Sequence, residues 1–118
     1  VVCVEGEVLG KPCNLEEAAQ MLQKLSGRDH RVLTGICLRH GSRTIVDLAV
    51  TRVWFRSLEN QELSSYLATR ESMDKAGGYA IQGYASRFVE RIEGCYNNIV
   101  GLPVSLVYLY LKSLCGES

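Results

Sequence analysis

The chain has 118 residues, and its 13 lysines and arginines balance 13 aspartates and glutamates, so the formal net charge is zero. The 47% hydrophobic and 22% charged shares are typical of a globular protein and exclude disordered, collagen-like and low-complexity chains. A balanced charge argues against a nucleic-acid polymer as partner, and no apolar run is long enough to span a membrane. The length predicts a single domain over residues 1–118.

The first quarter of the chain predicts a β-hairpin followed by a helix. Residues 1–9 have the pattern of a strand, a turn and a short returning strand. Asn14, with Glu17 three positions later, is a helix start signal, and Gly27 is expected to end that helix. The buried face of this helix is predicted to carry Leu15, Ala18, Leu22 and Leu25.

The middle of the chain predicts a second, longer hairpin. Strands over residues 31–38 and 44–56 flank the turn signal His40-Gly41-Ser42-Arg43, so these strands are expected to pair antiparallel. A second helix is predicted over residues 60–69 and a short strand over residues 88–92. Together these elements predict an α/β fold with a mixed, twisted sheet flanked by helices.

The last predicted helix covers residues 104–114, and Pro103 suits its first turn. This segment is apolar almost all round, which predicts burial on more than one side.

The five cysteines are scattered and form no Cys-x-x-Cys pair, so neither a disulfide framework nor a zinc site is expected. We expect reduced thiols in a cytoplasmic protein, most of them small core residues. His30 and His40 form no metal-binding pattern and are predicted to be strand or turn residues. No metal ligand set is identified.

Two segments are candidates for ligand binding. Residues 74–83 spend three glycines, a lysine, an aspartate and a glutamine on a stretch without helix or strand periodicity. Glycine allows a backbone to approach a ligand closely, but a structural turn explains the same residues equally well. Lys11, in Leu9-Gly10-Lys11-Pro12, suits a phosphate group, although a solvated lysine in a turn is the more common case. No catalytic group is identifiable from these patterns.

Several of these segments together resemble the Maf family, in matching order and spacing along the whole chain. The segments are Leu9 to Pro12, Glu17 to Leu22, Leu25 to Gly35, Asp74 to Gly83 and Asn98 to Pro103. Maf proteins are nucleoside triphosphate pyrophosphatases, which release a nucleoside monophosphate and pyrophosphate with the help of a divalent metal. The resemblance therefore implies such an enzyme, with Mg²⁺ or Mn²⁺ as cofactor and a nucleoside triphosphate as substrate. It leaves a homodimer open.

The resemblance also implies a segment before residue 1. The chain opens inside an apolar, β-branched stretch that does not begin with Met. Family members carry a Ser-x-Ser-Pro-Arg-Arg phosphate loop upstream, and an Ala-Asp-Thr triplet whose Asp is the proposed catalytic base. That Asp is expected two residues before Val1. This chain is thus expected to be the C-terminal part of a Maf-like domain, without a catalytic residue of its own and inactive by itself.

Two substrate-binding positions carry over from the family. Lys11 matches the lysine that contacts the triphosphate, and Gln82 matches the glutamine that marks the subgroup preferring dTTP and UTP. A carboxamide offers one donor and one acceptor to the imide edge of uracil or thymine. Asp74 and Lys75 accompany this glutamine in the subgroup and are expected to support the loop.

The resemblance thus predicts hydrolysis of dTTP, UTP and modified pyrimidine nucleotides, which would cleanse the nucleotide pool. A regulator of cell division and septum formation, acting by protein interaction, is the alternative from another functional class. An inactive fragment that retains a base-reading loop is a third.

Overall fold

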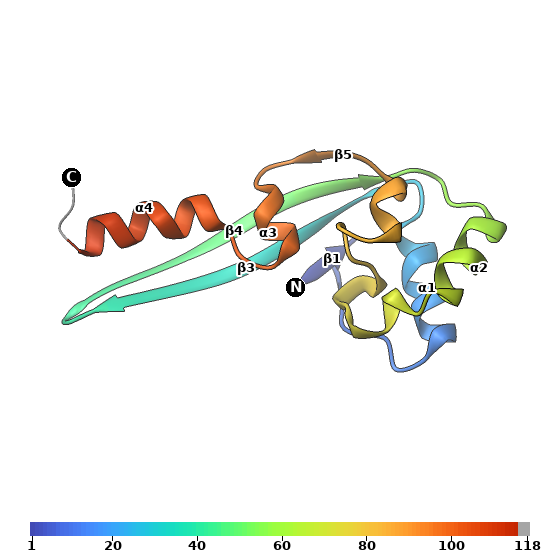
Figure 1. The fold of residues 1–118 in the computed structure, drawn as a ribbon, viewed down its shortest axis with the longest axis horizontal. Helices are drawn as coiled ribbons and strands as arrows, with labels where there is room; N and C mark the ends of the chain where they lie inside the picture. The colour runs from blue at the N-terminus through green and yellow to red at the C-terminus, as the bar shows by residue number, and fades with distance from the viewer. Residues whose placement is uncertain (116–118) are drawn as a thin grey trace.

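The computed structural model describes residues 1–115 and contains a five-stranded sheet in the order β2-β1-β3-β4-β5 (Figure 1). The strands are β1 (Val2–Val4), β2 (Glu7–Leu9), β3 (Asp29–His40), β4 (Arg43–Phe55) and β5 (Val89–Glu93). The predicted α/β class is confirmed. The sheet itself differs from the mixed sheet that was expected, because all four pairings are antiparallel. Two of the four pairings, β1 with β2 and β3 with β4, join consecutive strands through short turns, which requires an antiparallel arrangement.

The helices are α1 (Leu15–Leu25), α2 (Asn60–Ala68), α3 (Tyr96–Val100) and α4 (Val104–Leu114). Three 3₁₀ helices lie between α2 and β5, namely η1 (Glu71–Asp74), η2 (Ala76–Gly78) and η3 (Tyr84–Phe88). The sequence patterns predicted α1, α2 and α4 but neither α3 nor the 3₁₀ helices. Elements this short contain too few turns to show a periodic pattern.

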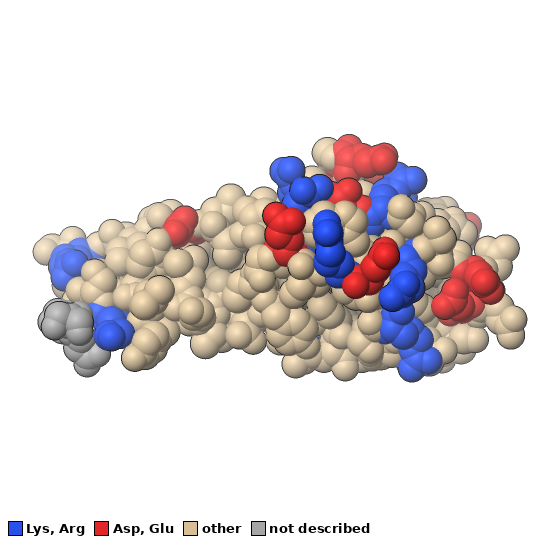
Figure 2. All heavy atoms as spheres, turned by 90° about the horizontal axis from the view of Figure 1, so that it is seen from above, with Lys and Arg blue, Asp and Glu red and all other residues tan. Residues whose placement is uncertain are grey.

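The molecule is elongated, with principal extents of 53 × 27 × 26 Å. One end is wide and carries β1, β2, β5, α1, α2 and the 3₁₀ helices, while the distal halves of β3 and β4 continue outward as a two-stranded arm with α4 alongside (Figure 1). Charged side chains gather over the wide end with both signs interleaved, and the arm carries few (Figure 2). No helix in the described part of the chain is long and apolar enough to cross a membrane.

Helix α1 begins where the sequence predicted. The Oδ1 atom of Asn14 accepts the backbone N–H of Glu17 at 2.8 Å, which satisfies one of the unpaired amides of the first turn. The helix buries Ala18, Met21, Leu22 and Leu25 against the sheet and the 3₁₀ helices. Gly27 follows with a φ of +68°, a conformation that favours glycine at a helix end.

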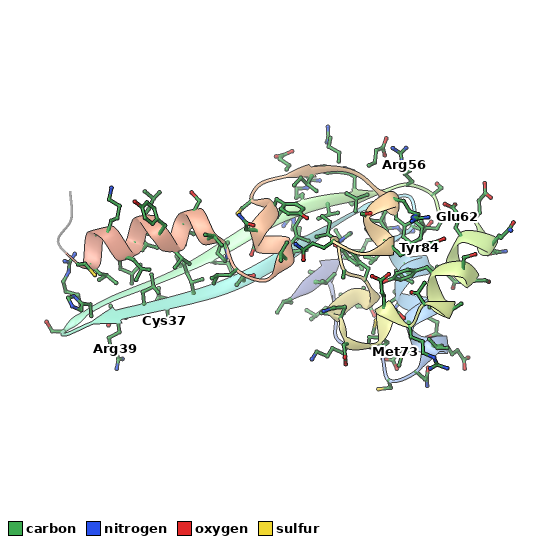
Figure 3. The ribbon with its side chains drawn as sticks, viewed as in Figure 1. Cys37, Arg39, Arg56, Glu62, Met73 and Tyr84 are labelled. Atoms are coloured by element: carbon green, nitrogen blue, oxygen red, sulfur yellow. The ribbon has the colours of Figure 1, made fainter. Side chains whose placement is uncertain are left out.

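The core is built on one parity of the two long strands. Thr51, Val53 and Phe55 of β4 are all buried, as are Val32 and Ile36 on β3. The other parity is open, and Val46, Leu48 and Val50 of β4 are exposed. Figure 3 shows Cys37 and Arg39 on the face of the arm that is turned away from α4. Burial along β4 thus alternates with a period of two, as in a strand with one covered face.

The environment of α4 contradicts the sequence prediction. Only Leu114 is buried in this helix, while Val104, Tyr108, Leu109 and Leu111 are about half exposed or more. The physical reason is that a two-stranded arm presents a single face, so an 11-residue helix beside it can bury only one stripe. Pro103 caps the helix at its N-cap position and does not lie in its first turn.

The expectation that most cysteines are core residues is also wrong. All five are free, but Cys13, Cys37 and Cys115 are exposed and Cys3 and Cys95 are half-buried. Cys37 shows the reason, because its parity on β3 places it on the open face of the arm. His30 and His40 both lie on β3, as predicted.

Candidate functional site

A cavity of about 400 Å³ lies where the start of β1, the middle of β3, the glycine-rich segment and α3 meet. We call it the main cavity. Its lining residues are Val1, Val2, Val32, Leu33, Thr34, Gly35, Lys75, Ala76, Tyr79, Ile81, Asn98, Ile99 and Gly101. The size is within the range of small-molecule sites, and most of the lining side chains are apolar.

A second, smaller cavity of about 100 Å³ adjoins it, and we call it the side cavity. It is lined by Lys75, Tyr79, Ala80, Ile81, Gln82, Ile99 and Val100. Four of these residues, Lys75, Tyr79, Ile81 and Ile99, line both cavities, so the two spaces share one wall.

Three of the four shared residues belong to the glycine loop, residues 74–83, and the fourth, Ile99, lies on α3. Gly77 and Gly78 have φ values of +76° and +83°, which L side chains rarely adopt. A Cβ atom at Gly77 would also lie 3.1 Å from Cγ1 of Val2 on β1. Here the glycine is required both by the backbone conformation and by the close approach of the loop to the sheet.

The glycine loop is held by residues that the sequence analysis did not single out. The Tyr66 hydroxyl of α2 donates to the carbonyl of Gly78 at 3.0 Å. The carboxylate of Glu71 accepts the backbone N–H of Tyr84, with the nearer oxygen at 2.9 Å. Gly83 makes this contact possible, because a Cβ atom there would lie 1.7 Å from Oε1 of Glu71. Figure 3 labels Tyr84, whose ring stacks in a tilted arrangement on that of Tyr66 with centroids 5.9 Å apart.

A buried aromatic cluster supports the wall from behind. His30 Nε2 and the Tyr79 hydroxyl are 2.6 Å apart, and the His30 ring also packs edge-on against Phe55. Burial lowers the pKa of His30 to about 4, because the charged imidazolium would lose its hydration. Burial likewise raises the pKa of the Tyr79 hydroxyl. Both groups are therefore neutral at pH 7, with the Tyr79 hydroxyl available to donate to the imidazole.

Asn98 ties α3 to the sheet at the other side of the main cavity. Its Nδ2 atom donates to the carbonyl of Val32 and to Oγ1 of Thr51, both at 3.0 Å. The Thr51 hydroxyl in turn donates to the carbonyl of Cys95 at 2.9 Å. The side chain is almost fully buried. In the sequence, Asn98 was marked only as the first residue of a segment, Asn98 to Pro103, that resembles the Maf family. That resemblance specified no contact for its side chain.

The two predicted binding segments meet in space. The backbone N–H of Gly77 donates to the carbonyl of Gly10 at 3.1 Å, so the glycine loop and the Leu9 to Pro12 segment lie side by side. Gln82 lies on the side cavity, as a ligand-binding residue should. Lys11 is exposed and forms no hydrogen bond or ion pair within the described residues, and it lines neither cavity.

The side chains of Asp74 and Lys75 take no part in the described contacts that hold the glycine loop. Both are exposed, and neither side chain forms a hydrogen bond or ion pair among residues 1–115. Their support of the loop stays a prediction. Lys75 lines both cavities, which places its side chain at the candidate site.

The described residues do not form a metal centre by themselves. Within residues 1–115, no three His, Cys, Asp or Glu side chains are placed to hold a metal ion together. The described residues therefore do not match a metal site built from protein ligands alone.

The chain matches the model of a protein family described as Maf-like protein over residues 1–114. It is 52% identical over 110 residues to a dTTP/UTP pyrophosphatase of Syntrophomonas wolfei, with 92% of this chain and 58% of the relative covered. It is 52% identical to the dTTP/UTP pyrophosphatase of Carboxydothermus hydrogenoformans, with 95% and 61% covered, and 49% identical to that of Pyrococcus abyssi, with 95% and 60% covered. The chain thus spans about three fifths of the length of the curated relatives it matches. With nearly its whole length matched and half of its residues identical, this chain belongs to the Maf family.

Proposed function

We propose that this chain is part of a nucleoside triphosphate pyrophosphatase that hydrolyses dTTP and UTP, and modified pyrimidine nucleotides, to the monophosphate and pyrophosphate. The observation that carries the proposal is sequence identity: about half of the aligned residues of this chain are identical to those of relatives named dTTP/UTP pyrophosphatase. The apolar main cavity with Gln82 on its side cavity supports it, because such a space suits a flat base with one polar edge. No described contact favours a regulator of cell division acting by protein interaction.

In this proposal Gln82 binds the base and Lys11 the phosphates. The Gln82 carboxamide offers an acceptor to N3–H and a donor to one carbonyl oxygen of the imide edge. Lys11 stabilises the negative charge that develops on the phosphates, and such a placed cation contributes about 2–4 kcal/mol in comparable sites. The contact between Gly77 and Gly10 fixes the spacing of the two segments.

The proposed catalytic base is an Asp two residues before Val1, in an upstream segment. Val1 itself lines the main cavity, and the backbone N–H of Leu33 donates to its carbonyl at 2.8 Å. Extended chain advances roughly 3.3 Å per residue, so a residue two positions earlier would lie within about 7 Å of Val1. We call the chain together with this proposed segment the intact protein.

The cofactor, the compartment and the assembly are further proposals. The divalent metal is Mg²⁺ or Mn²⁺, and the protein is cytoplasmic, which the five free cysteines support. A homodimer stays a proposal without a described interface.

The proposed function is tested by incubating the intact protein with dTTP, UTP, CTP and GTP in Mg²⁺ or Mn²⁺ and measuring pyrophosphate and monophosphate. Equal amounts of both products from dTTP and UTP are expected, with EDTA abolishing their release and added metal restoring it. Release of inorganic phosphate with a diphosphate, or no turnover of any pyrimidine triphosphate, would refute the proposal.

A further inference from the structure

We propose that Lys75 is a second base-reading residue, whose ammonium group donates to a carbonyl oxygen of uracil or thymine beside Gln82. The inference rests on the proposed function for the identity of the ligand. It assigns to Lys75 a part in selecting the base, in place of the support of the loop that its sequence position suggested.

Lys75 is one of the residues that line both cavities. Among the described residues, Lys75 is the only charged side chain that lines either the main or the side cavity. In the side cavity it faces the same space as Gln82, and the remaining lining residues are apolar apart from Tyr79. The Tyr79 hydroxyl is already bonded to His30 at 2.6 Å. Lys75 and Gln82 are thus the two side chains of the side cavity with uncommitted hydrogen-bonding groups.

Among the described residues, nothing occupies the ammonium group of Lys75, so this group is available to a ligand. The Lys75 side chain forms no ion pair or hydrogen bond with any described residue, although the backbone carbonyl of Lys75 accepts the N–H of Gly78 at 2.9 Å. Lys24 illustrates the contrast, because its Nζ atom lies 2.7 Å from a carboxylate oxygen of Glu7. Glu71, the acid next to the glycine loop, has both carboxylate oxygens engaged by the backbone N–H of Tyr84. Within residues 1–115, the Lys75 ammonium therefore has no internal partner to give up when a ligand binds.

The Lys75 ammonium and the Gln82 carboxamide together complement the imide edge of uracil. The imide edge of uracil presents acceptor, donor and acceptor, and one carboxamide matches the donor and only one of the two acceptors. The second carbonyl oxygen needs a donor, and a lysine ammonium is donor-only. Cytosine carries an amino group in place of O4 of uracil and keeps O2, so we place the Lys75 ammonium at O4, where a cation disfavours cytosine. Lys75 and Gln82 together would read all three positions.

The surroundings favour a base over a phosphate as the partner of Lys75. Val2, Val32, Leu33 and Ile81 give the main cavity apolar walls, which suit a ring better than an anion. In the described part of the chain, no second cationic side chain lines either cavity to share the charge of a phosphate.

The experiment measures binding, so that it does not depend on turnover. The affinities of UMP and CMP for the 118-residue chain are determined by calorimetry for the wild type and for Lys75→Met, Lys75→Arg and Lys112→Met. Met keeps the apolar stem of the side chain and Arg keeps the donors. Lys112, on α4, is a lysine that lines neither cavity and serves as the matched control. Circular dichroism confirms that each variant is folded.

We expect the wild type to prefer UMP and Lys75→Met to lose roughly tenfold of that preference, mainly through weaker UMP binding. Lys75→Arg should retain most of the preference and Lys112→Met all of it. An equal loss for both nucleotides would show that Lys75 contacts the phosphate, and an unchanged preference, or a wild type that binds neither nucleotide, would equally overturn the inference. Pyrophosphate release by the intact protein is measured separately. If the chain selects UMP through Lys75 but the intact protein turns over no pyrimidine triphosphate, the proposed function alone is refuted.

Discussion

Gln82 and Lys11 occupy different surroundings, although the family resemblance assigns both to the substrate. Gln82 lies on the side cavity beside Tyr79 and Ile81, whereas Lys11 is exposed and lines neither cavity. This separation is what a nucleotide requires, because the base prefers an enclosed apolar space and the phosphates stay close to solvent and cations. Substitutions at the two positions should therefore have different kinetic consequences.

Replacing Gln82 with Ala in the intact protein should change the base preference. The variant leaves the imide edge without its matched partner, which costs about 1–3 kcal/mol for each stranded polar group. The ratio of kcat/KM for UTP over CTP is therefore expected to fall at least about fivefold. Gln61→Ala is the matched control, since Gln61 is an exposed glutamine on α2 that lines neither cavity. An equal decrease for all nucleotides would mean that Gln82 acts on the phosphates or on the folding of the loop.

Replacing Lys11 with Ala should instead lower kcat/KM for every nucleotide by the same factor. The ammonium senses charge on the phosphates and has no access to the base, so the loss should be about 30-fold or more from about 2 kcal/mol of lost stabilisation. Lys112→Ala, on α4, serves as the control for loss of a lysine. A decrease confined to one base, or no decrease, would identify Lys11 as a solvated lysine in a turn.

His30 should make the protein less stable in mild acid. Its pKa is lowered to about 4 in the fold from an ordinary value of 6.5, so the unfolded chain binds the proton first as the pH falls. The free energy of unfolding should therefore decrease between about pH 6.5 and pH 4 by up to about 3 kcal/mol, and level off below.

Urea denaturation of the chain at pH 7 and pH 4.5 measures this decrease. His30→Gln removes the titration but can still bond to the Tyr79 hydroxyl, so the difference between the two pH values should shrink. His40→Gln changes an exposed histidine at the end of β3 and should preserve the wild-type difference. A His30→Gln protein with an undiminished pH dependence would assign the effect to other groups.

At the scale of elements, the glycine loop depends on contacts that its own residues cannot specify. Gly83→Ala would place a Cβ atom at the position of the Glu71 carboxylate, which must then move and release the backbone N–H of Tyr84. A stranded amide of this kind costs about 1–3 kcal/mol. The unfolding free energy should fall by that amount, and the amides near Tyr84 should exchange hydrogen faster.

Gly35→Ala is the control for this substitution. Gly35 lies in β3, where an added Cβ atom would meet no heavy atom within 4 Å and where φ is not positive, so its replacement should be neutral or slightly stabilising. If Gly83→Ala were as stable as Gly35→Ala, the Glu71 contact would contribute nothing to the loop.

The two-stranded arm of β3 and β4 is covered on one face by α4, which side-chain hydrogen bonds attach to it. Helix α4 is apolar on most sides, yet it packs on a ribbon of only two strands. Tyr110 donates a hydrogen bond to Asp47, and an imidazole nitrogen of His40 lies 2.9 Å from the carbonyl of Leu114, which attaches the helix near the tip of the arm. The hydrogen bond from Tyr110 also holds the pKa of Asp47 below its ordinary value.

At the scale of the whole molecule, the 118-residue chain should bind pyrimidine nucleotides but release no pyrophosphate. It holds the glycine loop and both cavities, while the proposed catalytic Asp and phosphate loop lie upstream. Pyrophosphate release from dTTP by the chain and by the intact protein, at equal concentration, checks this expectation. Comparable turnover by the two would place the catalytic residue within residues 1–118.

Much of the fold could be predicted because its signals are local. The Asn14 cap of α1 and the turn at Gly41 each depend on neighbouring residues, and each was found where the sequence placed it. The short α3 and the 3₁₀ helices escaped prediction because their positions depend on tertiary contacts, such as that between Tyr66 and Gly78. The burial of α4 was predicted wrongly because composition does not reveal how many faces the neighbouring sheet offers.

The candidate site, like the fold, was predicted only in part from the sequence. The sequence by itself determined the family resemblance and, through it, the choice of Lys11 and Gln82 as candidate binding residues. Only the tertiary structure decided that Gly77 hydrogen-bonds to Gly10, that His30 supports Tyr79, and that Lys75 shares a cavity with Gln82. The physical reason is that residue type and local spacing follow from short-range backbone preferences, whereas a cavity is enclosed by residues far apart in the chain, whose meeting depends on how the sheet and helices pack.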